Sequence, residues 1–381
     1  MQSTAEPAKP LDNRAGPNRS VVLVGHFTPP VHGMAVAMDA LGLLFTTLGP
    51  LIRLRTVPMR SMGGGAYHLR RAFLVFLAAA RLMLLRSRSD AVFLSVDAGK
   101  GMMYVIVLTW LARRLGFRVV LQHHSYAYIS RRSRLAAALV RAGGSRAHHL
   151  YSCQSACDEF RRLYPHAVRT SALSVAYAAA SPPEGRAPRD AFASRQLRVG
   201  HLSNLTLEKG LEEVIRFGRA AVHESQVERV ILAGPVGGTA ERTLIDSVAG
   251  ERGFEYRGPV TGKRKEDFFR DIDVFLFPTR YKNELSPLVI WEAMLRGVPV
   301  IAYKAGCLTQ AVLGEGNLVL EPSEDFTERA LRRIEHWSRS PGDFARAARA
   351  VTDAGRQERQ RAIADALQLG AELFASPRGR A

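Results

Sequence analysis

The stretch Glu284-Leu-Ser-Pro-Leu-Val-Ile-Trp-Glu292, continued by Ala293-Met-Leu-Arg-Gly-Val-Pro299, decides how the chain is interpreted. Ser286 is a favoured N-cap residue, and Pro287 suits the first helical position, where its missing N–H costs nothing. Gly297 predicts the end of that helix. The start of such a helix presents unpaired N–H groups and partial positive charge, which suit a phosphate. An ordinary helix with a solvated glutamate at each end would have the same pattern.

The geometry of this helix places its two glutamates on either side of the expected anion. At about 1.5 Å per residue, Glu292 lies roughly 7–8 Å beyond Pro287. The backbone amides expected at the anion are those of the neighbouring residues, because proline has none: Leu285, Ser286, Leu288 and Val289. Glu284 and Glu292 then flank the anion, where they can accept hydrogen bonds from hydroxyl groups.

Composition bounds the protein class. The 381 residues exceed a usual single core, so two domains are expected. A hydrophobic content of 47% with 23% charged residues is typical of a soluble globular protein. The cysteines Cys153, Cys157 and Cys307 form no zinc-ligand pattern, and their odd number favours a reduced, cytoplasmic protein over a disulfide framework.

The net charge of +18 is concentrated in the first half. Residues 1–190 hold 25 Lys and Arg against 9 Asp and Glu, whereas residues 191–381 hold 28 against 26. A basic half suggests a polyanionic partner, which would be nucleic acid or an anionic membrane surface. Solvated basic faces in an arginine-rich protein are the alternative.

Two apolar stretches bear on the membrane alternative. Residues 72–85 and 101–112 are apolar and bounded by arginines, but neither reaches the roughly 18 residues of a spanning helix. Such helices resemble segments that lie on a membrane surface, and buried helices of an α/β domain look the same. Residues 1–19 are polar and proline-rich, so we expect a disordered leader without a signal-peptide core.

Strands and helices alternate along the chain, which predicts parallel sheets. In the first half the strands are expected at 20–25, 91–95, 118–122, 148–151 and 172–175, with a helix over 35–48. In the second half they are expected at 197–202, 229–233, 254–256, 274–277, 298–303 and 318–320. The fold class is therefore α/β. Two Rossmann-like, doubly wound domains should face each other across a cleft.

Several polar segments follow the strands of the second half. Ser203-Asn204-Leu-Thr-Leu-Glu-Lys209-Gly210 places an ammonium at a helix entry, which suits a diphosphate. Gly258 and Val260 follow another strand, and the Glu284 stretch follows the next. All lie at carboxyl ends of strands, where open α/β sheets bind ligands.

The order of these motifs resembles the large retaining glycosyltransferase family with the GT-B fold, usually called family 4. The resemblance covers roughly residues 20–345. The family's paired glutamates match Glu284 and Glu292, with the Gly-x-Pro-Val that follows them. Its Gly-Arg-Leu-x3-Lys-Gly motif aligns with Ser203 to Gly210, where Asn204 replaces the arginine and leaves the phosphate contact mainly to Lys209.

The resemblance implies a role for each matched residue. Glu292 would bind the ribose of a nucleotide-sugar, and Glu284 the hydroxyls of the donor sugar. Lys209 and the amides of residues 285 to 289 would hold the diphosphate, and residues around Gly258 and Val260 would contact the base. Retention through front-face attack would need no separate general base.

The resemblance also points to the first domain. Gly33 would lie near the leaving phosphate and the acceptor. One residue of the pair His123-His124 would touch the donor sugar, and the sequence leaves open which one. Read without the family, paired histidines are more often structural. Ala176-Tyr177-Ala178 replaces the family's Asn-Gly.

No metal or other cofactor is expected, with the nucleotide-sugar as donor substrate. Asp271-Ile-Asp273 resembles the Asp-x-Asp metal motif of a different glycosyltransferase class, but Asp273 opens a buried strand. The GT-B class needs no catalytic metal.

The sequence thus predicts a glycosyltransferase that moves a hexose-type sugar to a lipid-linked or polysaccharide acceptor at the cytoplasmic face of an anionic membrane. The expected divisions are a leader (1–19), an acceptor-side domain (20–177), a linker (178–196), a nucleotide-sugar domain (197–345) and a helical tail (346–381). One alternative is a nucleotide-sugar epimerase, which would need an acid–base pair. The other is a basic nucleic-acid-binding protein, for which the aromatic interleaving is missing.

Overall fold

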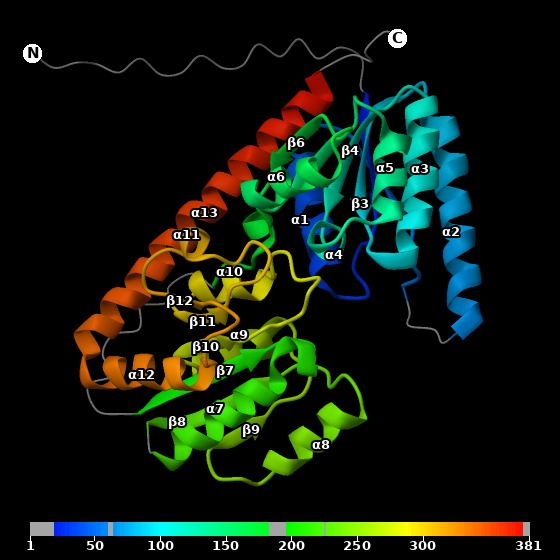
Figure 1. Cartoon of the computed structure of the whole chain (residues 1–381). Helices are drawn as coiled ribbons and strands as arrows, with labels where there is room; N and C mark the ends of the chain where they lie inside the picture. Colours follow the sequence, from blue (N-terminus) through cyan, green and yellow to red (C-terminus); the bar gives the residue numbers. More distant parts are fainter. Residues whose placement is uncertain (1–18, 60–63, 183–195, 225, 376–381) are drawn as a thin grey trace, which may run out of the picture.

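The computed structural model describes residues 19–59, 64–182, 196–224 and 226–375. The predicted leader and most of the predicted linker lie outside these ranges. Within them, two parallel sheets of six strands each carry helices on their faces, and a long final helix runs along both (Figure 1). This arrangement confirms the predicted α/β class.

The first sheet has the order β2-β1-β3-β4-β5-β6. Its elements are β1 Ser20–Gly25, α1 Gly33–Thr46, β2 Leu51–Arg55, α2 Gly64–Leu85, β3 Ser89–Val96, the 3₁₀ turn η1 Gly99–Gly101, α3 Met102–Arg114, β4 Arg118–His123, α4 Ala127–Ser130, α5 Arg134–Gly143, β5 His148–Tyr151, α6 Gln154–Leu163, β6 Arg169–Ala172 and the 3₁₀ turn η2 Val175–Ala178. We refer to this part as the N-lobe.

The second sheet has the order β12-β11-β10-β7-β8-β9. Its elements are β7 Leu197–Leu202, the 3₁₀ turn η3 Leu207–Lys209, α7 Leu211–His223, β8 Val227–Ala233, α8 Thr239–Val248, β9 Phe254–Tyr256, α9 Gly262–Asp271, β10 Val274–Phe277, α10 Leu288–Met294, β11 Val300–Tyr303, α11 Gln310–Leu313, β12 Leu318–Leu320 and α12 Phe326–Arg339. We refer to this part as the C-lobe.

Both sheets reverse their winding direction once. In the N-lobe the reversal lies between β1 and β3, because β1 pairs with β2 on one side and with β3 on the other. In the C-lobe it lies between β7 and β10, which pair directly. At such a switch point the two connections leave in opposite directions and open a crevice outside the carboxyl ends of the strands. The topology therefore provides one crevice in each lobe.

Two local predictions for the N-lobe are wrong. The strand expected at 172–175 lies at Arg169–Ala172, and residues 175–178 form a 3₁₀ turn instead. Strand β2 was not predicted, because its alternation of leucine and arginine (Leu51-Ile-Arg-Leu-Arg55) suits an edge strand and is short.

The last helix, α13 Pro341–Ala375, joins the two lobes. Its buried residues include Val351, which packs in one cluster with Trp291 of the C-lobe, and Leu369, in the same cluster as Phe45 of the N-lobe. Gly370 permits the close approach, because a Cβ there would lie 2.6 Å from Leu48 Cδ1 and 2.9 Å from Phe45 Cδ1. The lobes are therefore held together by a continuous apolar core.

Enlarging Gly370 should destabilise the protein through this contact. We expect Gly370→Leu to cost about 1–3 kcal/mol, the usual price of overpacking a filled core, and to lower the urea midpoint of unfolding. Gly342→Leu in the same helix is the matched control, since a Cβ there meets only Arg346 Nη1, at 3.9 Å. Equal midpoints for the two variants would contradict a tight junction between α13 and α1.

Candidate functional site

The crevice of the C-lobe is formed by the segments that follow β7 and β10. Lys209 ends η3, directly after β7, and Glu284 lies in the loop between β10 and α10. The Lys209 ammonium forms an ion pair with the Glu284 carboxylate, and both side chains are largely buried. Lys209 Nζ also lies 4.6 Å from the ring centre of Tyr281. The two residues that the sequence singled out in separate motifs are therefore in direct contact.

Two glycines allow these segments to approach so closely. Gly210 has a φ of +86°, and a Cβ there would lie 2.3 Å from the carbonyl oxygen of Pro278. Gly306, in the loop after β11, has a φ of +53°, and its Cβ would lie 2.2 Å from the carbonyl oxygen of Glu284. A side chain at either position would push a loop away from the ion pair.

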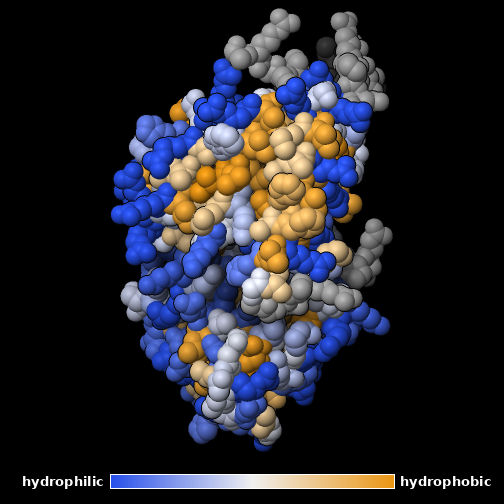
Figure 2. Space-filling view, turned by 90° about the vertical axis from the view of Figure 1, so that its right-hand side faces the viewer, coloured by the Kyte–Doolittle hydropathy of each residue, from blue (hydrophilic) through white to orange (hydrophobic). Residues whose placement is uncertain are grey.

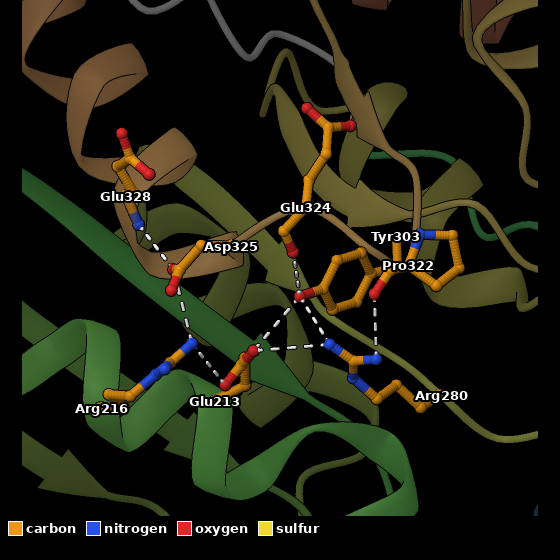
Figure 3. Close-up of polar contacts among 8 residues, drawn as sticks. All are labelled: Glu213, Arg216, Arg280, Tyr303, Pro322, Glu324, Asp325 and Glu328. Atoms are coloured by element: carbon orange, nitrogen blue, oxygen red, sulfur yellow. Dashed lines mark hydrogen bonds and ion pairs between the residues drawn. The ribbon is translucent and has the colours of Figure 1, made fainter.

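A polar network beneath the crevice fixes the same two segments (Figure 3). The backbone N–H of Arg280 donates to the carbonyl of Glu208 at 2.8 Å, which ties the β10 loop to the residue before Lys209. The Arg280 guanidinium donates to the Tyr303 hydroxyl at 2.8 Å and to the Pro322 carbonyl at 3.1 Å. The Tyr303 oxygen also lies 3.2 Å from Glu213 Oε1. Arg280 thus connects the site loop to α7, β11 and the segment before α12.

Glu292 lies in the second turn of α10 and is almost completely buried. Its carboxylate pairs with Lys265 Nζ of α9 at 2.6 Å. The sequence did not connect Lys265 with this glutamate, because the contact depends on how α9 packs beside α10. Each carboxylate of the crevice is therefore neutralised by its own lysine, which removes much of the repulsion that two carboxylates would exert on an anion.

The start of α10 differs from the prediction. Pro287 occupies the N-cap position with ψ of 125°, so the helix begins at Leu288 rather than at the proline. The Ser286 hydroxyl does not cap the helix and instead accepts from Trp291 Nε1 at 3.4 Å. The amides of Leu288 and Val289 open the first turn and have no acceptor within the helix. Leu285 is buried, and its carbonyl accepts from the N–H of Cys307 at 2.7 Å.

The remaining C-lobe candidates lie at neighbouring strand ends. Asn204 is exposed in the loop after β7. Gly258 follows β9 with a φ of +66°, and its carbonyl accepts from the N–H of Gly234 at 2.8 Å. Val260 is buried two residues later. These positions border the same edge of the sheet as Lys209.

The crevice of the N-lobe holds a cluster of polar residues that the sequence did not reveal. His26 follows β1 and Asp97 follows β3, and His26 Nε2 lies 2.7 Å from Asp97 Oδ1. Arg71 of α2 pairs with the other oxygen of Asp97. Burial alone would raise the pKa of Asp97, but the hydrogen bonds and charges of His26 and Arg71 outweigh it and lower that pKa. His32 Nε2 completes the cluster, 3.3 Å from His26 Nδ1.

The two histidines that end β4 have different surroundings. Both ring nitrogens of His123 are engaged inside the N-lobe, with Tyr128 Oη at 2.9 Å and His149 Nδ1 at 3.0 Å. His124 Nε2 is buried and has no hydrogen-bond partner among the described residues. Burial, followed by the nearby His26, lowers the pKa of His124 to about 3. His124, neutral at pH 7, therefore keeps a ring nitrogen without a partner, whereas both ring nitrogens of His123 are occupied within the N-lobe.

The two crevices meet through contacts between the lobes. The backbone N–H of Tyr126, two residues after His124, donates to the carbonyl of Asn283 at 3.1 Å. Because Asn283 precedes Glu284, this bond brings the β4 end against the loop that carries the glutamate. Gly33 lies exposed at the start of α1, where an added Cβ would meet no atom within 4 Å.

The prediction of reduced cysteines is wrong in this structure. Cys153 of the N-lobe and Cys307 of the C-lobe form a disulfide with Cα atoms 5.9 Å apart, and Cys157 is a buried free thiol. The two bonded residues are 154 positions apart in the sequence, and only the facing of the two lobes brings them together. Sequence spacing offered no signal for this pairing.

The residues described include no group of three or more His, Cys, Asp or Glu side chains that could hold a metal ion. The Asp-x-Asp pair has other partners. The Asp273 carboxylate accepts from the N–H of Arg198 at 2.8 Å, and Asp271 pairs with Arg257 at 2.8 Å. These two aspartates therefore hold the start of β10 and the end of α9.

The sequence of the C-lobe matches a family of known proteins. Residues 196–336, a little over a third of the chain, match the family model described as Glycosyl transferases group 1. The matched segment contains Lys209, Glu284 and Glu292. No curated protein matches the sequence.

Solved structures resemble the whole chain. Anabaena HepE, solved in complex with UDP and glucose, superposes with a TM-score of 0.66 at 16% identity, over 94% of this chain and 99% of that one. Sucrose-phosphate synthase from Thermosynechococcus elongatus gives 0.66 at 18%, over 94% and 100%. The catalytic domain of Starch Synthase IV from Arabidopsis thaliana, bound to ADP and acarbose, gives 0.68 at 11%, over 92% and 100%. The GT-B arrangement of two facing domains is thereby confirmed.

The buried histidines predict how stability depends on pH. Burial lowers the pKa of His149 to about 3, below its ordinary value near 6.5, so the unfolded chain takes up a proton first as the pH falls. His149 therefore contributes full stability above about pH 6.5 and progressively less toward pH 3. We expect the free energy of unfolding to fall between pH 7 and pH 5.

His149→Gln should make that decrease shallower when urea unfolding is measured at several pH values. His336→Gln is the control, because His336 is exposed on α12 beside Asp343. An unchanged slope in His149→Gln would show that this residue is not held neutral.

Proposed function

We propose that the protein is a retaining glycosyltransferase that transfers a hexose-type sugar from a nucleotide-sugar to a lipid-linked or polysaccharide acceptor. The observation that carries the proposal is the Lys209–Glu284 ion pair at the switch point of the C-lobe. It lies beside the open first turn of α10, within the segment that matches the group 1 glycosyltransferases. Structures that share the fold were solved with UDP and glucose or with ADP.

The diphosphate of the donor would lie between Lys209 and the first turn of α10. An ammonium has three N–H donors, so Lys209 can hold Glu284 and a phosphate oxygen at the same time. The amides of Leu288 and Val289 add two further donors at the positive end of the helix. These groups would stabilise the charge that develops on the leaving phosphate as its bond to the anomeric carbon breaks.

The two glutamates would orient the donor on either side of the diphosphate. Glu292, held by Lys265, would accept from the ribose hydroxyls, and residues near Gly258 and Val260 would border the base. Glu284 would accept from hydroxyls of the sugar beside the reacting carbon. His124 would donate or accept a hydrogen bond through its unpartnered Nε2. Glu284 thus acts as a positioning and electrostatic group, with no covalent step assigned to it.

The N-lobe cluster favours transfer over epimerisation. His26, Asp97 and Arg71 are paired with one another, and His124 is held neutral by its low pKa. An epimerase would need a pair of groups that exchange protons at the sugar. The charged groups of this cluster better suit the binding of an acceptor hydroxyl or phosphate.

The exposed face of α2 and α3 supports an acceptor that is held at a membrane. No helix in the described part of the chain could cross a bilayer. On α2, Leu69, Phe73, Phe76 and Leu84 are each more than half exposed, and Met103, Val107 and Trp110 form a similar stripe on α3. Figure 2 looks onto the side of the molecule that carries α2 and α3 and shows an apolar area there with hydrophilic groups around it. We refer to it as the α2–α3 face.

An anionic bilayer is the occupant that fits this face. Exposed arginines, including Arg81, Arg86 and Arg88, border the apolar stripe of α2. Residues 51–150 hold 17 basic side chains against 2 acidic ones. Apolar side chains would enter the interface while the arginines contact lipid phosphates. This supports a peripheral position on the cytoplasmic face of a membrane, where lipid-linked acceptors are accessible.

The donor site is tested by Lys209→Met and Glu292→Gln, which keep the side chains at similar size. We expect each to lower kcat/KM for sugar transfer at least about 100-fold, which is the usual loss when one stabilising donor is removed. The assay is mass spectrometry of products from a panel of nucleotide-sugars with lipid-linked acceptors. Lys282→Met, an exposed lysine of the same loop, is the control. Full transfer by either site variant would refute the assignment.

The membrane proposal is tested by flotation of the protein with anionic vesicles at low salt. Phe73→Ser combined with Phe76→Ser should abolish flotation, because both side chains leave the apolar stripe. Leu43→Ser is the control, an equally exposed leucine on α1. If wild type remains with the aqueous phase and forms a dimer that the double variant lacks, the α2–α3 face binds a second copy instead.

A further inference from the structure

A second basic site lies at the opposite edge of the N-lobe sheet. A cavity of about 680 Å³ opens where β4, β5 and β6 begin, between the ends of α3 and α13. The candidate donor and acceptor groups lie at the carboxyl ends of these sheets. Since β4 spans six residues at about 3.3 Å each, the two edges are roughly 20 Å apart. The cavity is therefore separate from the crevice that we assign to sugar transfer.

The lining of this cavity is strongly basic. Its charged or titratable side chains are one glutamate, Glu372, and six basic groups: Arg113, Arg114, Arg118, His148, Arg146 and Arg169. Among the described residues, no carboxylate forms an ion pair with any of the five arginines. Arg113 donates to the carbonyl of Arg141 at 3.2 Å, and Arg118 to that of Glu372 at 2.8 Å. Carbonyls satisfy N–H groups without neutralising charge.

Three of these groups begin adjacent strands and are close enough to repel one another. Arg118, His148 and Arg169 are the first residues of β4, β5 and β6, and His148 and Arg169 face each other in the β5–β6 register. Burial lowers the pKa of both Arg118 and His148, and Arg169 lowers each pKa further. Asp90 and Glu372 oppose this effect at Arg118, and Glu372 opposes it at His148, without reversing it. Arg118 Nε is buried without a hydrogen-bond partner. The cluster thus holds more cationic than anionic side chains, and at least one of its donors is left over.

We propose that this arginine cavity binds a phosphate-type anion, either a free diphosphate or the headgroup of an anionic phospholipid. Guanidinium groups match phosphate oxygens with paired N–H donors, and five of them line this cavity, from the end of α3, the starts of β4 and β6, and the loop before β5. The volume is that of small-molecule pockets and exceeds what a single phosphate needs. Bound anion would offset the repulsion between Arg118 and Arg169. It would also contact the end of α13, which Arg118 already holds through the Glu372 carbonyl.

The test is calorimetric titration of full-length protein with inorganic pyrophosphate. Three proteins are compared: wild type, Lys209→Met, and Lys209→Met combined with the double variant Arg146→Gln with Arg169→Gln. Arg146 and Arg169 are exposed, so the double variant should fold, which circular dichroism checks. We expect binding to persist in Lys209→Met, where the proposed donor site is impaired. In the Lys209→Met background the double variant should bind at least about 10-fold more weakly.

The control removes two exposed arginines elsewhere, Arg332→Gln with Arg339→Gln on α12, and should leave pyrophosphate affinity unchanged. Flotation with phosphatidate vesicles distinguishes a phospholipid headgroup from a free diphosphate. It is measured in proteins that also carry Phe73→Ser and Phe76→Ser, so that the α2–α3 face does not contribute to binding. Flotation that depends on Arg146 and Arg169 assigns the headgroup, and pyrophosphate binding without flotation assigns the free anion. Absence of both, or equal binding by the Arg146 and Arg169 variant, would overturn the proposal.

Discussion

The rest of the structure depends on the reversal of strand order in each parallel sheet. Where neighbouring strands send their connections in opposite directions, no helix covers the carboxyl ends, and the side chains that follow the two strands can meet. In the C-lobe these side chains are Lys209 and Glu284, and in the N-lobe they are His26 and Asp97. Each switch point therefore holds a buried carboxylate in contact with a nitrogen of the other strand-end segment, and Asp97 also forms an ion pair with Arg71. The hydrogen bond from Tyr126 to Asn283 brings the two crevices against each other.

Charge neutralisation by lysines explains how two buried carboxylates could lie beside an anionic ligand without strong repulsion. Glu284 and Glu292 would repel a diphosphate if they stood alone, and burial without a partner would favour their neutral forms. Lys209 and Lys265 cancel those charges, and the remaining carboxylate oxygens would accept from the sugar and ribose hydroxyls of the proposed donor. The hydrogen bond between Arg280 and Tyr303 fixes the loop after β10, so the position of this loop does not depend on the ligand. The site is thus organised before substrate binds, which is the condition for electrostatic stabilisation.

The sequence predicts features that arise from residues close together in the chain, and it does not predict contacts between distant segments. The alternation of strands and helices is local, and it gave the α/β class and most strands of the C-lobe. Glu284, Glu292 and Lys209 were found because each lies in a recognisable strand-end motif. The pairing of Lys265 with Glu292, the cluster around Asp97 and the Cys153–Cys307 disulfide join segments far apart in the chain. No spacing in the sequence encodes those contacts. The helix start at Leu288 differed because the Ser286 hydroxyl turns toward Trp291.

The central claim is that the diphosphate of a nucleotide-sugar occupies the C-lobe switch point. A crystal structure of the protein soaked with a nucleoside diphosphate tests it most directly. The account places phosphate oxygens within hydrogen-bond distance of Lys209 Nζ and the amides of Leu288 and Val289, with the ribose hydroxyls at Glu292. A diphosphate bound elsewhere, with Lys209 contacting only Glu284, would contradict it.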